Sequence, residues 1–155
     1  MHRNAVRVAE AARRVGLEIE IREFPDGTRT AEDAAKAIGV ELGQIVKSLV
    51  FAVDGEAVVA LVPGDRRLDE AALAAAAGGE TCKRLDADAV RAATGFPVGG
   101  VPPLGHANPL RVFADTGLLR YDVVWAAAGT PHENFGVHPR TLVDAVGGVL
   151  GDLSR

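Results

Sequence analysis

Residues 44–51, with the sequence QIVKSLVF, form a run of strand-favouring side chains interrupted by one lysine. Valine, isoleucine and phenylalanine fit a pleated, buried surface, so the run predicts a strand that meets protein on both faces. Alternation along the strand places Lys47 on the same face as Leu49 and Phe51. The stem of the lysine therefore leaves the sheet among apolar neighbours, and its ammonium group needs a partner.

Two interpretations of Lys47 are open at this point. Its stem can extend so that the ammonium reaches water or an internal carboxylate, for which Asp115 and Asp122 are candidates. Alternatively, the ammonium lies at the floor of a cleft and binds an anionic ligand such as a phosphate. The strand alone does not decide between a structural and a ligand-binding lysine.

Length and composition indicate an ordinary globular protein. The 155 residues fit one domain over residues 1–155, and 48% hydrophobic with 25% charged residues exclude a disordered chain. A single cysteine, Cys82, allows no internal disulfide and favours a reducing compartment. No stretch approaches the roughly 20 apolar residues of a membrane span. We therefore expect a cytoplasmic protein with no membrane partner.

The net charge restricts the expected partners. At −4, it has the wrong sign for a protein that holds nucleic acid on a broad basic surface. We expect no DNA binding, and any contact with RNA should be local. One end of an RNA molecule held in a pocket would satisfy this condition.

The remaining pattern predicts helices and strands in mixed order. Helical spacing of apolar residues recurs in segments 3–15, 30–38, 68–77, 86–93 and 141–146. Strand patterns occupy segments 17–21, 44–53, 57–62, 81–85, 111–114, 122–128 and 134–137. The Asp54-Gly55 pair predicts a tight hairpin that gives the lysine strand an antiparallel neighbour. Gly147 and Gly148 are expected to end the last helix and close the fold.

Residues 96–106, with the sequence FPVGGVPPLGH, form the most irregular loop. Its glycines permit close backbone approach and positive φ, while its prolines fix the path of the chain. Such a loop can hold backbone N–H groups toward a substrate oxygen, or serve as a rigid connector. His106 can orient a substrate or cap the loop. In the turn before the second helix, Thr28 and Arg29 can face a ligand or act as a cap and a solvated charge.

Several kinds of chemistry are excluded by residue type and spacing. His132 and His138 match no zinc-site spacing and no second cysteine is present, so we expect no metal and no cofactor. Cys82 has no histidine nearby in sequence, which argues against a nucleophilic cysteine. Phosphate-binding P-loop, dinucleotide and serine-hydrolase motifs are missing. Any reaction would therefore depend on positioning and backbone dipoles.

Three segments, 44–51, 99–106 and 124–131, occur in an order and spacing that resemble the YbaK family of aminoacyl-tRNA deacylases. Residues 28–32 also match, and the similarity extends from about Arg3 to Gly147. The family is related to the editing domain of bacterial prolyl-tRNA synthetases. The resemblance implies an α+β fold with a mixed, barrel-like β-sheet surrounded by helices. It also implies hydrolysis of the ester that joins a wrong amino acid to the tRNA 3′ end.

The resemblance further implies roles for individual residues. Lys47 corresponds to the signature lysine and would hold the phosphate or ribose of the tRNA end. Gly99 with Pro103 matches the Gly-x-x-x-Pro loop, so the amides of Gly99 and Gly100 would orient the ester carbonyl and stabilise its oxyanion. The attacking water would be activated by a ribose hydroxyl of the substrate. The expected substrate-binding residues are Thr28, Ser48, Val101, Pro102, Pro103, Gly105 and His106.

The expected substrate is Cys-tRNA(Pro) or Ala-tRNA(Pro), and prolyl-tRNA synthetase is an expected partner. Some relatives carry a histidine on the strand that here reads Trp125-Ala126-Ala127-Ala128, so the role of that group does not transfer. The alternative function is a non-catalytic module that senses an aminoacyl ester or nucleotide and docks on a synthetase. Hydrolysis of another small ester or amide is a third alternative. The buried lysine together with the Gly99 loop favours the enzyme.

Overall fold

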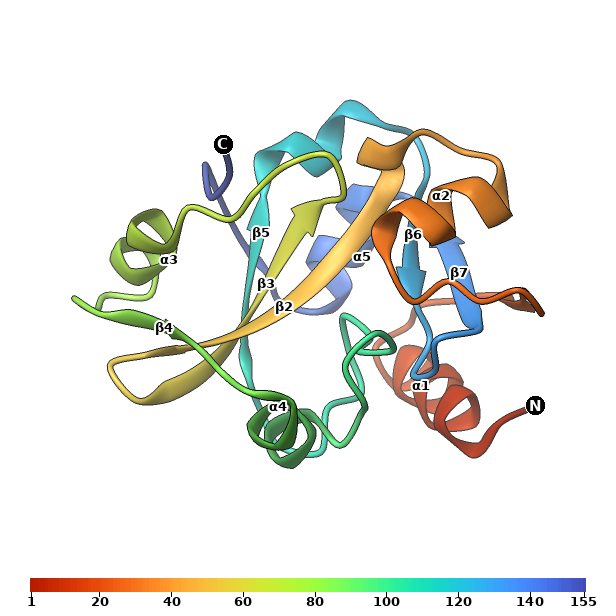
Figure 1. Ribbon diagram of the computed structural model, residues 1–155, viewed down its shortest axis with the longest axis horizontal. Coiled ribbons are helices and arrows are strands. Elements are labelled where there is room, and N and C mark those ends of the chain that lie inside the picture. Colours follow the sequence, from red (N-terminus) through yellow and green to blue (C-terminus); the bar gives the residue numbers. More distant parts are fainter.

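The computed structural model describes residues 1–155 and contains five α-helices around one mixed, eight-stranded sheet (Figure 1). The helices are α1 (Arg3–Arg14), α2 (Ala31–Ile38), α3 (Glu70–Ala76), α4 (Ala87–Thr94) and α5 (Pro139–Ala145). The strands are β1 (Ile21–Glu23), β2 (Ile45–Val53), β3 (Glu56–Pro63), β4 (Cys82–Arg84), β5 (Arg111–Asp115), β6 (Val124–Ala127), β7 (Glu133–Val137) and β8 (Val149–Gly151). The predicted α+β class with a mixed sheet is confirmed.

The strand order is β1-β7-β6-β2-β3-β5-β8, with β4 also paired to β2. Strands β1 and β8 lie at the two ends of this order. Strand β2 is central, because it has β3 along one edge and both β6 and β4 along the other. The predicted lysine strand is therefore the strand from which the sheet extends in both directions.

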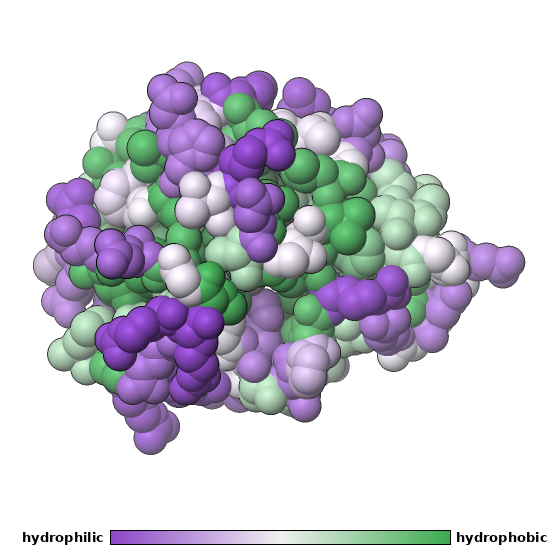
Figure 2. All heavy atoms as spheres, turned by 180° about the vertical axis from the view of Figure 1, so that it is seen from behind, coloured by the Kyte–Doolittle hydropathy of each residue, from purple (hydrophilic) through white to green (hydrophobic).

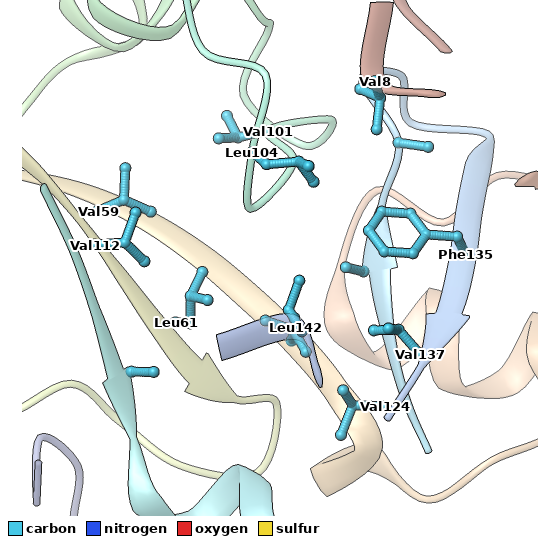
Figure 3. Packing of buried hydrophobic residues seen from close by; sticks show 14 of the residues in the cluster. Val8, Val59, Leu61, Val101, Leu104, Val112, Val124, Phe135, Val137 and Leu142 are labelled. Carbon is cyan, nitrogen blue, oxygen red and sulfur yellow. The ribbon is translucent and has the colours of Figure 1, made fainter. Parts of the chain in front are cut away.

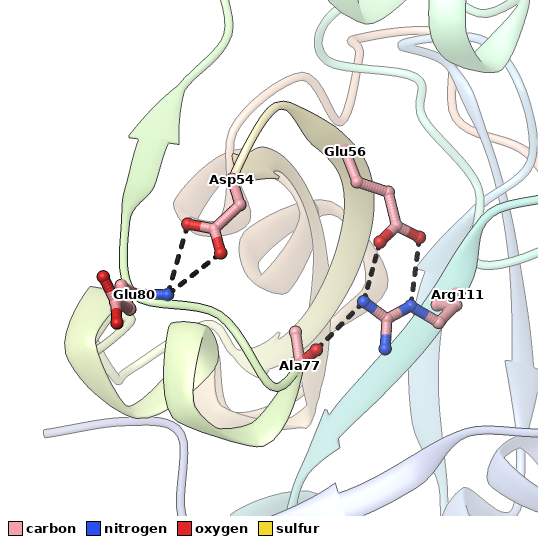
Figure 4. Close-up of polar contacts among 5 residues, drawn as sticks. All are labelled: Asp54, Glu56, Ala77, Glu80 and Arg111. Carbon is pink, nitrogen blue, oxygen red and sulfur yellow. Dashed lines mark hydrogen bonds and ion pairs between the residues drawn. The ribbon is translucent and has the colours of Figure 1, made fainter.

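The β2–β3 hairpin follows the sequence prediction closely. Asp54 and Gly55 form its two-residue turn with φ values of 48° and 85°, the positive pair that a type I′ turn requires. The Asp54 carboxylate accepts a hydrogen bond from the Glu80 amide (Figure 4) and another from the Thr81 amide. These bonds hold the hairpin turn against the segment that leads into β4.

At the start of β3, a second contact fixes the same end of the hairpin. Arg111 of β5 donates to both carboxylate oxygens of Glu56, at 3.0 and 2.8 Å (Figure 4). The same guanidinium donates to the Ala77 carbonyl that follows α3. Strands β3 and β5 and helix α3 are thus connected at one end of the sheet.

The two edges of β2 are paired very differently. Strand β3 pairs with every residue from Val46 to Val53. On the other edge, β6 pairs only with Ile45 and Val46, and β4 pairs only with 51–53. The Gly64 amide donates to the Ile45 carbonyl, so the odd-numbered backbone groups of β2 face β3. The N–H and C=O of Ser48 therefore face the edge that lacks a neighbouring strand.

Two apolar clusters cover the two faces of the hairpin. The first contains 21 buried residues and brings Leu61 of β3 together with Phe135 of β7 and Leu142 of α5 (Figure 3). The second contains 10 buried residues, among them Phe51 of β2 and Leu73 of α3. Both faces of β2 thus meet protein, as its sequence predicts.

Two predicted boundaries are wrong. The strand expected over residues 17–21 exists only as Ile21–Glu23, because β1 pairs with β7 only there, although Leu17 is buried as its alternation predicts. The fold does not close at Gly147 and Gly148, since β8 follows them and pairs in parallel with β5. A short β8 without apolar alternation leaves little signal in the sequence.

Asp115 is not a partner of Lys47, contrary to one of the sequence hypotheses. Its carboxylate accepts hydrogen bonds from the amides of Leu153 and Gly117, and it is 3% exposed. Asp122, the other candidate, lies exposed on the surface and makes no hydrogen bond to the lysine. The Asp115 carboxylate instead holds the C-terminal segment against β5.

No helix is both long enough and apolar enough to cross a membrane. On the face opposite to the view of Figure 1, apolar side chains lie in patches that polar side chains separate (Figure 2). This face therefore presents a mixed surface to its surroundings.

Candidate active site

A cavity of about 340 Å³ lies along the unpaired edge of β2. Its walls come from β2, from α2 and the turn before it, from Arg84 and Leu85, from α4 and the loop after it, and from β6 and β7. The charged side chains in this lining are Arg29, Lys47 and Arg84, and none is acidic. Histidine, cysteine and tyrosine do not contribute to the walls either. The cavity can therefore bind an anion, but it offers no carboxylate or imidazole to act as a general base.

Lys47 is half-buried at this wall, and its ammonium contacts a backbone carbonyl rather than either of the carboxylates considered from the sequence. Its Nζ donates a hydrogen bond to the Arg66 carbonyl. Desolvation lowers the pKa of Lys47 from 10.5, while the charges of Glu32 and Asp65 oppose that shift. An ammonium has three N–H donors, so those not used by the Arg66 carbonyl are free to bind an anion in the cavity.

Ser48 has three polar groups at the cavity that no other part of the protein satisfies: its hydroxyl, its backbone N–H and its backbone C=O. Its hydroxyl oxygen is buried and has no hydrogen-bond partner. Its backbone N–H and C=O face the edge without a strand. A buried polar group without a partner costs about 1–3 kcal/mol, so such groups occur where a ligand can satisfy them.

Thr28 lies in the wall of the cavity and holds Asn134, a residue that the sequence analysis missed. The Thr28 hydroxyl donates to the Pro131 carbonyl at 3.3 Å and accepts a hydrogen bond from the Asn134 side-chain amide. The helix cap is Thr30, whose hydroxyl accepts from the Asp33 amide. Asn134 is 3% exposed, and its side-chain carbonyl accepts no hydrogen bond within the protein. The signal in the sequence that could have revealed Asn134 is a polar residue at a buried position of a short strand.

The Gly99 loop reaches the cavity, but one expected donor is already occupied. The Gly100 amide donates to the Pro97 carbonyl at 3.0 Å, closing a turn in which Gly99 has a φ of 92°. In this structure the Gly100 amide is therefore not free to donate to an oxyanion. A Cβ atom at Gly100 would lie 2.8 Å from the Thr130 backbone, so this glycine permits close packing. The Gly99 and Val101 amides have no partner within the protein, and both residues line the cavity.

The second half of the loop lies away from the cavity. Pro102, Pro103, Gly105 and His106 do not line it. The His106 Nε2 lies 2.7 Å from the Pro102 carbonyl, and burial lowers the pKa of this histidine below 6.5. A neutral imidazole that donates to Pro102 ties the loop together. The contact between His106 and Pro102 holds the part of the loop that follows Gly99 and Val101.

Cys82 also lies outside the cavity lining. Burial, followed by the charge of Glu70, raises the pKa of its thiol above 9.0. A protonated thiol is a poor nucleophile. The raised pKa agrees with the sequence argument against a nucleophilic role for Cys82.

A family model for the aminoacyl-tRNA editing domain matches residues 25–145, the range that contains every residue of the cavity wall. The chain belongs to the aminoacyl-tRNA editing domain family. The predicted resemblance to YbaK-type proteins is therefore confirmed.

Individual relatives of this editing domain point to prolyl-tRNA synthetases. The chain is 41% identical over 99 residues to the proline–tRNA ligase of Nitratidesulfovibrio vulgaris, covering 64% of the chain but 17% of the ligase. It is 33% identical over 126 residues to the protein YwhH of Bacillus subtilis, covering 81% of the chain and 80% of YwhH. The crystal structure of a candidate trans-editing enzyme for prolyl tRNA synthetase superposes with a TM-score of 0.93 and 42% identity, covering 100% and 99% of the two chains. The chain thus has the fold of that crystal structure over its whole length.

Proposed function

We propose that this protein is a trans-editing hydrolase that cleaves the ester between a wrong amino acid and the 3′-terminal ribose of a tRNA. The observation that carries the proposal is the cavity on the unpaired edge of β2, where Lys47 meets free backbone amides and no acidic side chain. Such a site binds an anionic substrate and stabilises negative charge that develops on it.

The residues of the cavity divide the task between the two ends of the substrate. Lys47 binds the phosphate or ribose of the terminal nucleotide through its free N–H donors. The Gly99 and Val101 amides donate to the ester carbonyl oxygen and stabilise the oxyanion. The α-ammonium group of the amino acid meets two acceptors without partners, the Ser48 carbonyl and the Asn134 side-chain carbonyl.

Hydrolysis needs a proton acceptor, and the substrate itself supplies one. Water attacks the ester carbonyl carbon, and the neighbouring ribose hydroxyl takes part in accepting its proton, since the cavity wall contains no carboxylate or imidazole. The bond between the carbonyl carbon and the ribose oxygen then breaks. The leaving ribose oxygen takes up the proton that the water lost, passed on by the neighbouring hydroxyl, and the amino acid leaves as a carboxylic acid that ionises in water. The protein contributes position and charge stabilisation.

The proposed substrate is tRNA(Pro) charged with cysteine or alanine. Most of the apolar side chains in the cavity wall are small or β-branched, among them Val46, Val50, Val101 and Ala127, and the larger ones are Leu49, Phe51 and Leu85. Such a wall favours a small side chain by shape, the kind of selection worth about 1–3 kcal/mol per methylene. The similarity to proline–tRNA ligases supports tRNA(Pro) as the carrier.

The test is deacylation of tRNAs charged with wrong amino acids, beginning with Cys-tRNA(Pro) and Ala-tRNA(Pro). We expect the wild-type protein to release the amino acid and Lys47→Ala to lose that activity. Lys36→Ala, on the exposed side of α2, is the matched control and should behave as wild type. Full activity of Lys47→Ala would contradict the proposal.

The second candidate function is a non-catalytic module that senses an aminoacyl ester or nucleotide and docks on a synthetase. The cavity wall without a nucleophile–base pair is the observation that favours it. Binding of charged tRNA that depends on Lys47, with no hydrolysis across the panel, would establish this function instead.

A further inference from the structure

A second, larger cavity of about 570 Å³ adjoins the first one at β2. The two cavities share Lys47, Leu49, Phe51 and Arg84 in their walls. The second cavity is completed by Arg66, Arg67, Leu68, Glu70 and Arg155. We call this second cavity the basic groove, because five of its nine lining residues are lysine or arginine and one is acidic.

The arginines of the basic groove have no ion-pair partners. The ion pairs of the protein join Arg14 to Glu10, Arg111 to Glu56 and Arg120 to Asp65. None of the groove arginines takes part in them, although the whole chain has a net charge of −4. The positive charge of Arg67 also helps to lower the pKa of Lys47. Unpaired cations that repel one another at one place favour an anionic ligand.

Hydrogen bonds fix the backbone positions of the arginines that line the groove. The Arg67 amide donates to the Arg155 carbonyl at 2.9 Å, and the Arg155 amide donates back to the Arg67 carbonyl at 2.8 Å. Lys47 donates to the Arg66 carbonyl. The C-terminal segment, the turn after β3 and strand β2 thus fix where the cations of the groove emerge.

We propose that the basic groove binds the phosphates of the single-stranded nucleotides that precede the terminal ribose of an RNA 3′ end. This inference rests on the proposed function, because a ribose ester in the first cavity places the adjoining phosphates beside Lys47. Lys47 lies in the walls of both cavities, and Arg66, Arg67 and Arg155 add positive charge to the wall of the groove only. Leu49 gives it an apolar floor against which sugars and bases can lie. A local groove of this kind lets an acidic protein hold RNA at one end only.

The test uses a double variant, Arg67→Gln with Arg155→Gln, in the full-length chain. Both side chains are exposed and neither lines the first cavity, so folding and the ester site should be preserved. Arg3→Gln with Arg13→Gln makes the same change in charge on exposed positions of α1 and is the control. Two quantities are measured. The first is the affinity for an RNA hairpin that has a single-stranded 3′ end and carries no amino acid, over a range of salt concentrations. The second is the rate of hydrolysis of a small aminoacyl-adenosine ester without phosphates.

We expect the groove variant to bind the RNA hairpin about 10-fold more weakly. The slope of log affinity against log salt should also fall by about 1 for each phosphate that the groove no longer neutralises. The control variant should match wild type, and hydrolysis of the small ester should be equal in all three proteins. RNA affinity and salt slope equal to wild type in the groove variant would overturn the inference, as would an equal weakening in the control.

The two claims fail separately in this design. If no protein hydrolyses the small ester or charged tRNA while RNA affinity still depends on Arg67 and Arg155, the hydrolase proposal fails and the groove stands. If wild type hydrolyses both substrates but the groove variant binds RNA normally, the groove fails and the hydrolase stands. Loss of small-ester hydrolysis in the groove variant would place these arginines in the ester site and also overturn the inference.

Discussion

The two edges of β2 differ in how much of each is paired with a neighbouring strand. Along the β3 edge, pairing continues from Val46 to the Asp54–Gly55 turn, and apolar clusters cover both faces. Along the opposite edge, pairing stops after Val46 and resumes at Phe51, leaving Ser48 without a strand neighbour. The first edge satisfies its polar groups within the protein, whereas the second leaves them for a ligand. Stability and function are thus divided between two edges of one strand.

The largest effect on stability should come from the paired edge. Leu61→Ala removes a side chain of β3 that is 0% exposed, and we expect it to lower the free energy of unfolding by about 2–5 kcal/mol. Leu61 lines neither cavity, so the folded fraction should retain RNA binding. Denaturant unfolding checks the first expectation. A decrease below about 1 kcal/mol would show that this edge is not where stability resides.

A smaller loss of stability is expected from Gly100→Ala, at the loop that borders the open edge. The new Cβ atom would lie 2.8 Å from the Thr130 backbone, and overpacking of this kind costs about 1–3 kcal/mol. Because the shift moves Gly99 and Val101, deacylation should fall as well. Thermal unfolding and rate measurements on one preparation check both effects. An unchanged melting temperature would contradict the close approach.

Ser48→Ala should separate function from stability. Its hydroxyl is buried without a partner, so removal should leave the free energy of unfolding unchanged or raise it by up to about 1 kcal/mol. Deacylation should fall by about 10-fold because the hydroxyl can no longer form a hydrogen bond with the substrate. The matched control is Ser154→Ala, outside both cavities. Destabilisation by Ser48→Ala would mean that the hydroxyl serves the fold.

The smallest and most specific effect is a dependence on pH. Burial lowers the pKa of Lys47 below 10.5, so its charge is lost as pH rises through that lowered value, and affinity for an anionic substrate should fall there. The same shift means that the charged lysine reduces stability below the folded-state pKa, and that this cost disappears as pH rises toward 10.5. Lys47→Arg stays charged and should bind RNA with a flat profile over this range. RNA affinity measured against pH for both proteins provides the check.

Local pattern predicted the elements around the site. The β-branched run at Lys47, the Asp54-Gly55 turn and the helix predicted from residue 30 each depend on neighbouring residues, and each is found as predicted. Features that depend on distant segments could not be found in this way. The gap beside Ser48 exists because β6 and β4 end where they do.

The occupied Gly100 amide and the basic groove could not be predicted from the sequence either, and for the same reason: both depend on how the chain folds back on itself. The amide is used because the loop forms a turn at Pro97, which the glycine and proline content alone did not specify. The groove requires Arg67 and Arg155, 88 positions apart, to meet through backbone hydrogen bonds. Sequence spacing carries no information on such a meeting.

The most direct test of the account is a map of backbone amide NMR shifts while the protein is titrated with adenosine that carries an amino acid on a 3′-amide, which cannot be hydrolysed as an ester. We expect the largest shifts at Ser48, Gly99 and Val101, together with the Asn134 side-chain amide. The Leu61 amide on the paired side should stay unchanged. Saturable shifts confined to the β3 side of the sheet or to α1 would contradict the claim that the open edge of β2 is the substrate site.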